Sequence, residues 1–296
     1  MIDFFRDMSA NVFLQTGLIA GLLASVACGV VGPLVVTRRI VFLAGAIAHA
    51  SLAGVGGSIF LQHHQPAIFS WFQPIYGALL AALAAAVIIG VVHDRVAERM
   101  DTLIGALWAV GMSVGVMLIK YTPGYHAELM SYLFGNLSMV QAGDLWFIAG
   151  LDVVILATIA VMYKRLLAVC VDPEQARLQG VNVLAVQITL LCLVALTVIS
   201  LMQVVGLILV LALLTLPAAT AAHHTTRMAA MMSVATCLCL LLCTLPRVAV
   251  YGSRLSPESA IVLAAAGGYL LSVAIRRWRA HANGLRVTTT AGGSDR

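Results

Sequence analysis

The stretch Val41–Gly54, VFLAGAIAHASLAG, places His49 inside an apolar, glycine-containing segment that begins just after Arg38 and Arg39. His49 lies ten residues after Arg39, which corresponds to about 15 Å along a helix. That depth is close to the middle of a hydrocarbon layer about 30 Å thick. Ionisable side chains at such a depth usually line a pathway, although a histidine that bonds a neighbouring helix explains the same position. This segment alone leaves both interpretations open.

The composition around this segment indicates a membrane protein. Of the 296 residues, 61% are hydrophobic and 10% are charged, and the mean hydropathy is +1.01. This leaves too little polar surface for a water-soluble globule, so we predict an all-α, polytopic membrane protein with eight or nine transmembrane helices. The expected spans are residues 12–36, 41–61, 75–92, 102–119, 145–162, 184–202, 205–222, 228–246 and 258–275, and residues 129–144 are expected to form an external or re-entrant helix.

The arginines and lysines indicate the orientation of the chain. When the spans are threaded in order, most of the seventeen basic residues fall on one side of the membrane. By the positive-inside rule that side is cytoplasmic, with the N-terminus outside and the C-terminus inside. The net charge of +5 thus reflects topology, and no nucleic-acid partner is expected. Residues 1–279 are predicted to form one transmembrane domain, and residues 280–296 a disordered cytoplasmic tail.

The lysines exclude a phosphate-binding loop, which needs Gly-Lys before Ser or Thr. The two lysines, Lys120 and Lys164, follow Ile119 and Tyr163. The hydrolase patterns HExxH and GxSxG are also absent, so the chain is not expected to be an enzyme or to carry its own ATPase site. Transport would have to be driven by an ion gradient or by ATP hydrolysis in another subunit.

The loop Tyr163–Val183, YKRLLAVCVDPEQARLQGVNV, contains the signals of a short helix. Asp172 is suited to cap its start, Pro173 to fill its first turn, and Gly180 to end it. Such a helix between two spans suits docking to a cytoplasmic subunit, although an ordinary structured loop would carry the same residues.

Several segments, taken in order, resemble the integral membrane subunits of ABC importers for zinc, manganese and related ions, the ABC-3 type family. The resemblance runs from about residue 15 to 275. The segments that carry it are GLLASVACGVVGPLVVTRRIVFLAGAIAHASLAG, Ser131–Asn136, Ala176–Val183, and Gln203–Gly206 through to Leu216–Ala221.

The resemblance implies a type II importer permease that works as a homodimer. It also implies a separate cytoplasmic ABC ATPase that binds ATP and contacts residues 172–180, and a periplasmic or extracellular metal-binding protein. No permanently bound cofactor is implied, because the divalent metal is the transported substrate. Such a subunit belongs in the plasma membrane, which is the inner membrane of a bacterium.

The resemblance also implies a metal site with one departure in this chain. The family pairs an aspartate with a histidine four residues later, and here the histidine is His49 but the aspartate position is Gly45. Zinc accepts imidazole readily while manganese prefers oxygen ligands, so we predict a zinc importer, with a manganese or iron importer as the alternative. Asp152, at a similar depth in the fifth span, is hypothesised to supply the missing carboxylate, or else to bond another helix without touching metal.

A rival interpretation is a stand-alone secondary transporter or channel. Such proteins are often built from inverted repeats, which leave internal similarity between the two halves of the sequence. The segment around His49 has no counterpart in the second half of this chain. Co-purification of an ATPase would separate the two classes.

Overall fold

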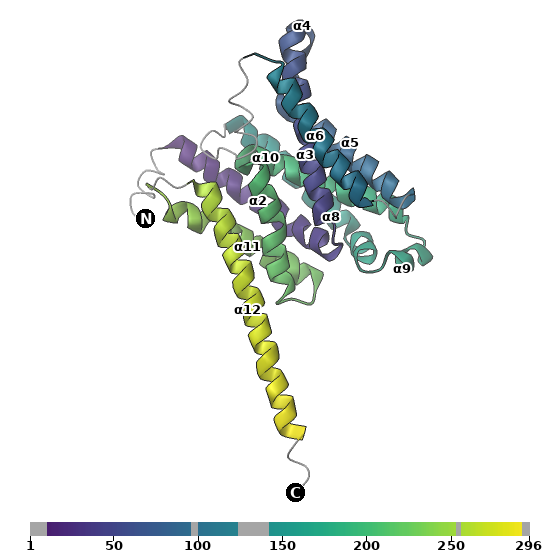
Figure 1. Ribbon diagram of the computed structural model, residues 1–296, viewed down its shortest axis with the longest axis vertical. Coiled ribbons are helices and arrows are strands. Elements are labelled where there is room, and N and C mark those ends of the chain that lie inside the picture. The colour runs from purple at the N-terminus through teal and green to yellow at the C-terminus, as the bar shows by residue number, and fades with distance from the viewer. Residues whose placement is uncertain (1–10, 96–99, 124–141, 253–255, 292–296) are drawn as a thin grey trace.

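The long apolar segments of this chain fold as helices, which satisfy every backbone polar group within one segment in a lipid environment. The computed structural model describes residues 11–95, 100–123, 142–252 and 256–291, and all its regular elements are helical (Figure 1). The helices are α2 (Val12–Thr37), α3 (Val41–His64), α4 (Pro66–Phe69), α5 (Pro74–Arg95), α6 (Met100–Lys120), α8 (Ala142–Val171), α9 (Pro173–Leu178), α10 (Val183–Ala222), α11 (Met228–Ala249) and α12 (Pro257–Ala291).

Among these described elements, eight helices are long and apolar enough to cross a membrane. The prediction of an all-α, polytopic protein is therefore confirmed. The expected spans 184–202 and 205–222 form the single helix α10, whose backbone breaks at Gly206 (φ 73°, ψ 166°). Glycine adopts this positive φ without the steric cost that a side chain would bring. The part beyond the break, Leu209–Ala222, is too short to cross a bilayer by itself.

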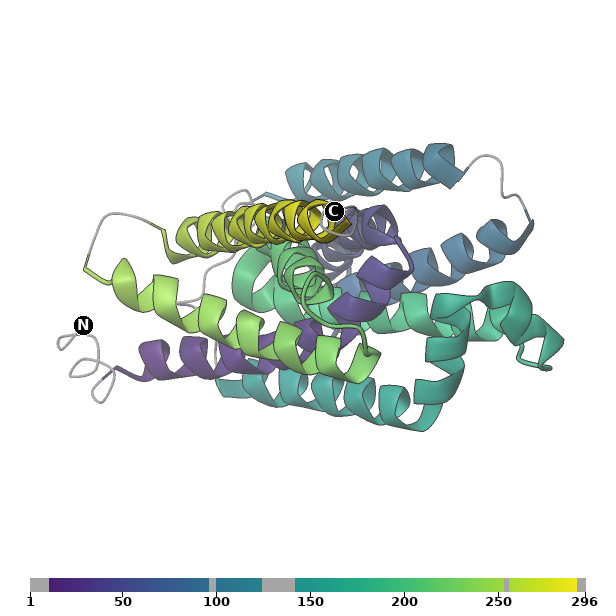
Figure 2. The ribbon, with the colours of Figure 1, turned by 90° about the horizontal axis from the view of Figure 1, so that it is seen from below.

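The broken helix α10 lies at the centre of the bundle. It contacts α2, α3, α5, α8, α11 and α12, and α3 lies between α5 and α6 (Figure 1). Figure 2 shows α11 lying alongside α2, with α12 on its other side. The spans of α2 and α3 are mostly buried, whereas those of α6 and α12 leave most of their apolar surface exposed. An exposed apolar face of this kind suits contact with lipid or with other transmembrane helices.

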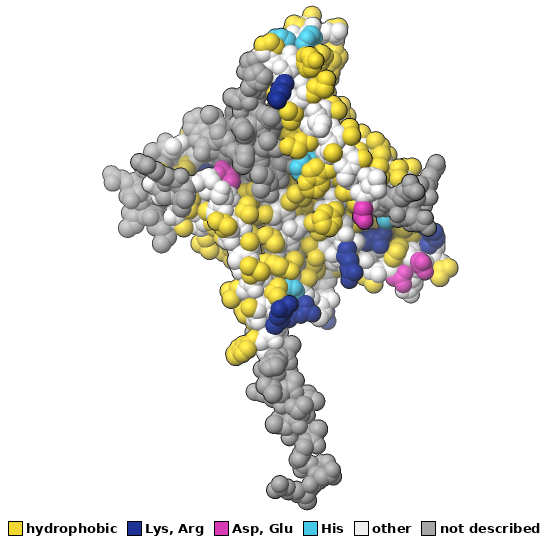
Figure 3. Space-filling view, in the orientation of Figure 1, with side chains coloured by type: hydrophobic (Ala, Val, Ile, Leu, Met, Phe, Trp, Pro, Cys, Tyr) yellow, Lys and Arg dark blue, Asp and Glu magenta, His cyan; other side chains and the backbone are white. Residues whose placement is uncertain are grey.

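The basic side chains on the face shown in Figure 3 concentrate in two areas. Figure 3 shows lysine and arginine side chains around α9 and around the lower part of α12, while the upper end near α4 is mostly hydrophobic. The positive-inside rule predicts that these two areas lie on the cytoplasmic side.

Helix α12 continues to Ala291, past residue 280 where the sequence predicts a disordered tail to begin, so the boundary between domain and tail stays a prediction. Most of the predicted helix at 129–144 lies outside the described residues. The segment Ser131–Asn136 lies wholly outside them.

Candidate functional site

His49 lies in α3 with its side chain half-buried. Its Nδ1 atom is 2.9 Å from the carbonyl oxygen of Gly45, one helical turn earlier. Because a carbonyl oxygen only accepts hydrogen bonds, Nδ1 carries the proton of the neutral ring and Nε2 keeps its lone pair. Within the described part of the chain, Nε2 has no hydrogen-bond partner. His49 therefore presents an imidazole nitrogen of the kind that binds first-row divalent metals.

The indole of Trp108 covers one face of the His49 ring. The two ring centroids are 4.1 Å apart and the planes differ by 23°. Trp108 comes from α6, whose backbone touches that of α3: a Cβ added at Gly111 would lie 2.6 Å from Cα of Ala50. Trp108 could not be predicted from the sequence, because its contact joins two helices and leaves no local pattern.

Asp152, the second predicted metal ligand, lies in α8 and is only 4% exposed. The Ser200 hydroxyl donates to its Oδ1 at 3.5 Å, and among the described residues its buried Oδ2 has no hydrogen-bond partner. A buried carboxylate with so little support is costly in the ionised form. Asp152 is thus an unusual polar group in an apolar helix, as expected of a group with a functional role.

The contacts of His49 and Asp152 are made to different helices. His49 contacts α6 through Trp108, whereas Asp152 contacts α10 through Ser200. In the ranges that the structure describes, no group of three or more histidine, cysteine, aspartate or glutamate side chains could hold a metal ion. The hypothesis that Asp152 supplies a carboxylate to the metal therefore remains a prediction.

Replacing Asp152 by asparagine is expected to separate stability from transport. The neutral amide keeps the shape of the side chain and removes a buried, poorly paired charge, so the thermal midpoint in detergent should stay the same or rise. If the carboxylate neutralises the passing cation, metal uptake should fall several-fold at equal expression. The matched control is Asp101→Asn, at an exposed position of α6, which should leave both properties unchanged. Normal uptake in Asp152→Asn would remove Asp152 from the pathway.

The predicted short cytoplasmic helix is present as α9. The Asp172 carboxylate accepts the backbone N–H groups of Glu174 and Gln175, both at 3.0 Å, and Gly180 has the positive φ of 78° that ends the segment. Leu178, at the last turn, is 89% exposed. An exposed leucine on a capped helix beside basic side chains is a suitable contact for another protein.

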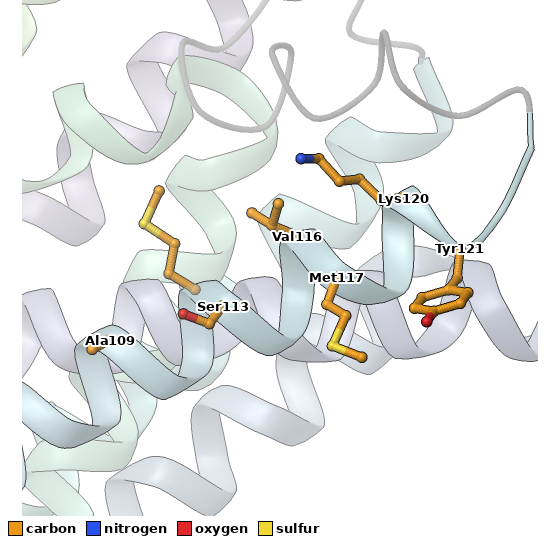
Figure 4. Close-up of a pocket in the computed structure, with 7 residues that line it drawn as sticks. Ala109, Ser113, Val116, Met117, Lys120 and Tyr121 are labelled. Carbon is orange, nitrogen blue, oxygen red and sulfur yellow. The ribbon is translucent and has the colours of Figure 1, made fainter.

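A shallow groove of about 760 Å³ runs along the exposed side of α6 (Figure 4). Its lining is apolar apart from Ser113 and the end groups of Lys120 and Tyr121. Met112, which also lines it, lies one helical turn after Trp108 in α6.

Two further histidines meet a serine at the end of α10. Nδ1 of His223 and Nε2 of His224 lie 3.0 and 2.9 Å from the hydroxyl oxygen of Ser272 in α12. Burial, and then the positive charges of Arg276 and His224, lower the pKa of His223 below its usual value. This contact joins the end of α10 to α12 and could not be predicted from the sequence.

Comparison with known proteins places the chain among transport proteins. The model of the ABC 3 transport family matches residues 10–276. A membrane protein of Synechocystis sp. is 40% identical over 277 residues, which cover 94% of this chain and 95% of the relative. The "Probable metal transport system membrane protein" of Chlamydia trachomatis is 35% identical and covers 89% of each chain.

Two similar proteins come from streptococci. The "Manganese import system permease protein ScaB" of Streptococcus parasanguinis is 32% identical and covers 91% of this chain and 93% of the relative. The solved structure of PsaBC from Streptococcus pneumoniae in complex with Fab matches with a TM-score of 0.80 and 30% identity, and covers 92% of this chain and 95% of that one. The expected type II importer permease fold is therefore confirmed.

Proposed function

Because this chain belongs to the ABC 3 transport family, as the membrane-spanning permease of a metal ABC importer, we propose that it carries divalent manganese into the cell. As the permease it has no ATPase site, and it acts with an ATPase subunit and a metal-binding protein. The proposal rests on the likeness to the manganese permease ScaB over 91% of this chain, and on the imidazole nitrogen of His49, which has no hydrogen-bond partner among the described residues.

The likeness to the manganese permease ScaB favours manganese over the zinc that the sequence predicts. The prediction of zinc rests on the missing aspartate at position 45, and the relatives reported above give it no support. Imidazole binds manganese more weakly than zinc. A weak contact is what a site of passage requires, because a tightly held ion would not leave. His49 then serves as a transient ligand, and Asp152 is the candidate for a carboxylate that lowers the cost of the passing charge.

The ATPase is proposed to bind at α9. Its exposed Leu178 and the surrounding basic side chains supply an apolar contact and a charged rim (Figure 3). In this arrangement the basic side chains around α9 and the lower part of α12 face the cytoplasm, and the N-terminus lies outside. Two copies of the chain in the plasma membrane form the pathway between them. Closure of the ATPase on ATP would shift α9 and open the pathway to one side at a time.

The metal content of cells tests the substrate. Cells that lack this protein, grown under metal limitation, should contain less manganese by elemental mass spectrometry, and the wild-type chain should restore it. Loss of zinc or iron alone would reassign the substrate within the same family. Unchanged content of all three metals would refute metal import by this chain.

Co-purification tests the ATPase contact and the rival mechanism. The tagged wild-type chain should bring down a soluble nucleotide-binding protein, and Leu178→Asp should lose it because a charge is placed in an apolar contact. Gln65→Asp, at an exposed position between α3 and α4 and away from α9, is the control and should keep the partner. A wild-type chain that transports without any such protein would support a stand-alone transporter.

A further inference from the structure

The residue at position 45 and the indole of Trp108 compete for the same space. Gly45 is buried in α3, and a Cβ added there would lie 2.7 Å from Cζ3 and 3.2 Å from Cη2 of Trp108. The shorter distance is below any normal carbon–carbon contact, so a side chain at 45 and the indole in its present place exclude each other. The indole is rigid, and its outer edge cannot bend away from the contact as a flexible side chain would.

Helix α6 cannot easily move away to make room. At Gly111 its backbone meets Ala50, and at Gly115 it meets the carbonyl of Leu52, which a Cβ at Gly115 would approach to 2.5 Å. Trp108 lies one turn from the first of these contacts and on the same side of α6. The stacking partner of His49 is thus fixed by the close approach of two helices.

We propose that Trp108 is a specificity-determining residue for the metal at His49, because its indole orients the imidazole and occupies the space that a ligand side chain at position 45 would need. The inference rests on the proposed function, since it takes His49 to contact the ion. The ion then meets Nε2 of His49 beside an aromatic surface, with no carboxylate from the preceding turn of α3. Without an oxygen ligand there, manganese is held loosely and zinc competes for the site.

A double-mutant cycle tests the shared space. Gly45→Ala is expected to lower the thermal midpoint of the purified protein in the wild-type background, because the new Cβ meets the indole. In the Trp108→Ala background the same substitution should cost much less, since the space is then empty. An equal cost of Gly45→Ala in both backgrounds would overturn the steric part of the proposal.

Metal competition tests specificity. In Gly45→Asp/Trp108→Ala the carboxylate lies one turn before His49, and the zinc concentration that halves manganese uptake should rise about tenfold, a typical effect of changing the groups around a metal ligand. Trp108→Phe keeps an aromatic face and should retain manganese uptake. In Trp108→Ala, manganese uptake should fall several-fold. Equal uptake in these two variants, or unchanged zinc competition in the double variant, would overturn the role of Trp108.

Fluorescence provides a readout that does not depend on transport. Trp71, Trp146 and Trp278 are 68%, 83% and 74% exposed, so their replacement by phenylalanine should be mild and leave Trp108 as the only tryptophan. Co²⁺ at His49, next to an indole 4.1 Å away, should quench this fluorescence, and His49→Ala should abolish the quenching. A protein with only Trp71 is the control. Quenching that persists in His49→Ala would overturn the proposal, whereas failure of wild-type uptake alone would refute the proposed function.

Discussion

His49→Ala is expected to lower metal uptake at least about tenfold while the protein remains folded. The substitution removes the imidazole in the middle of α3 that is proposed to contact the ion, and loss of one such group has effects of this size. It leaves Gly45 with its carbonyl bonded within the helix, so α3 itself loses no backbone support. Uptake of radioactive manganese by vesicles that contain the permease and its ATPase, with external metal-binding protein, measures the effect.

The matched control for His49→Ala is His64→Ala in the same helix. His64 is exposed at the end of α3, and its Nδ1 bonds the carbonyl oxygen of Phe60 at 3.1 Å, as Nδ1 of His49 bonds Gly45. The two substitutions therefore remove the same ring and the same type of hydrogen bond at different depths. Uptake by His64→Ala should stay within about twofold of wild type. Wild-type uptake by His49→Ala would make His49 a packing partner of Trp108 and nothing more.

The helices of this protein could be predicted because each is a local feature of the sequence. Hydropathy locates the spans, and Asp172 followed by Pro173 locates α9, since an N-cap and a first-turn proline act within a few residues. The sequence predicts a break between the spans 184–202 and 205–222, and the structure has one at Gly206. A glycine in an apolar run is compatible with a straight helix as well as a broken one. The packing around the glycine determines which of the two forms.

The candidate site could be predicted only in part. His49 follows from its depth in a span, but its partner Trp108 is 59 residues later in the sequence, and only the packing of α3 on α6 joins them. The prediction that Asp152 assists His49 rests on equal depth, which leaves open the side of the helix on which a residue lies. The metal is predicted from one missing carboxylate, whereas the relative ScaB is named as a manganese permease.

The contact between α3 and α6 carries the second large expected effect. Gly56→Ala should destabilise the protein strongly, because a Cβ at Gly56 would lie 2.6 Å from the carbonyl oxygen and 3.0 Å from Cα of Gly115 in α6. Both atoms belong to the backbone, so relief requires the helices to separate along a contact that also holds Trp108 over His49. Overpacking of this kind costs about 1–3 kcal/mol.

The neighbouring Gly57 provides the control for Gly56→Ala. A Cβ at Gly57 would meet nothing within 4 Å, so Gly57→Ala adds the same methyl group to the same helix without a clash. Alanine is better than glycine in a helix by up to about 1 kcal/mol, and Gly57→Ala should be neutral or slightly stabilising. The thermal midpoints of the two purified variants should therefore differ by about 5 °C or more, since 1 kcal/mol shifts the midpoint of a large domain by about 2–4 °C. Equal midpoints would mean that α6 moves freely against α3. That result would contradict the inference that Trp108 is held in a fixed position over His49.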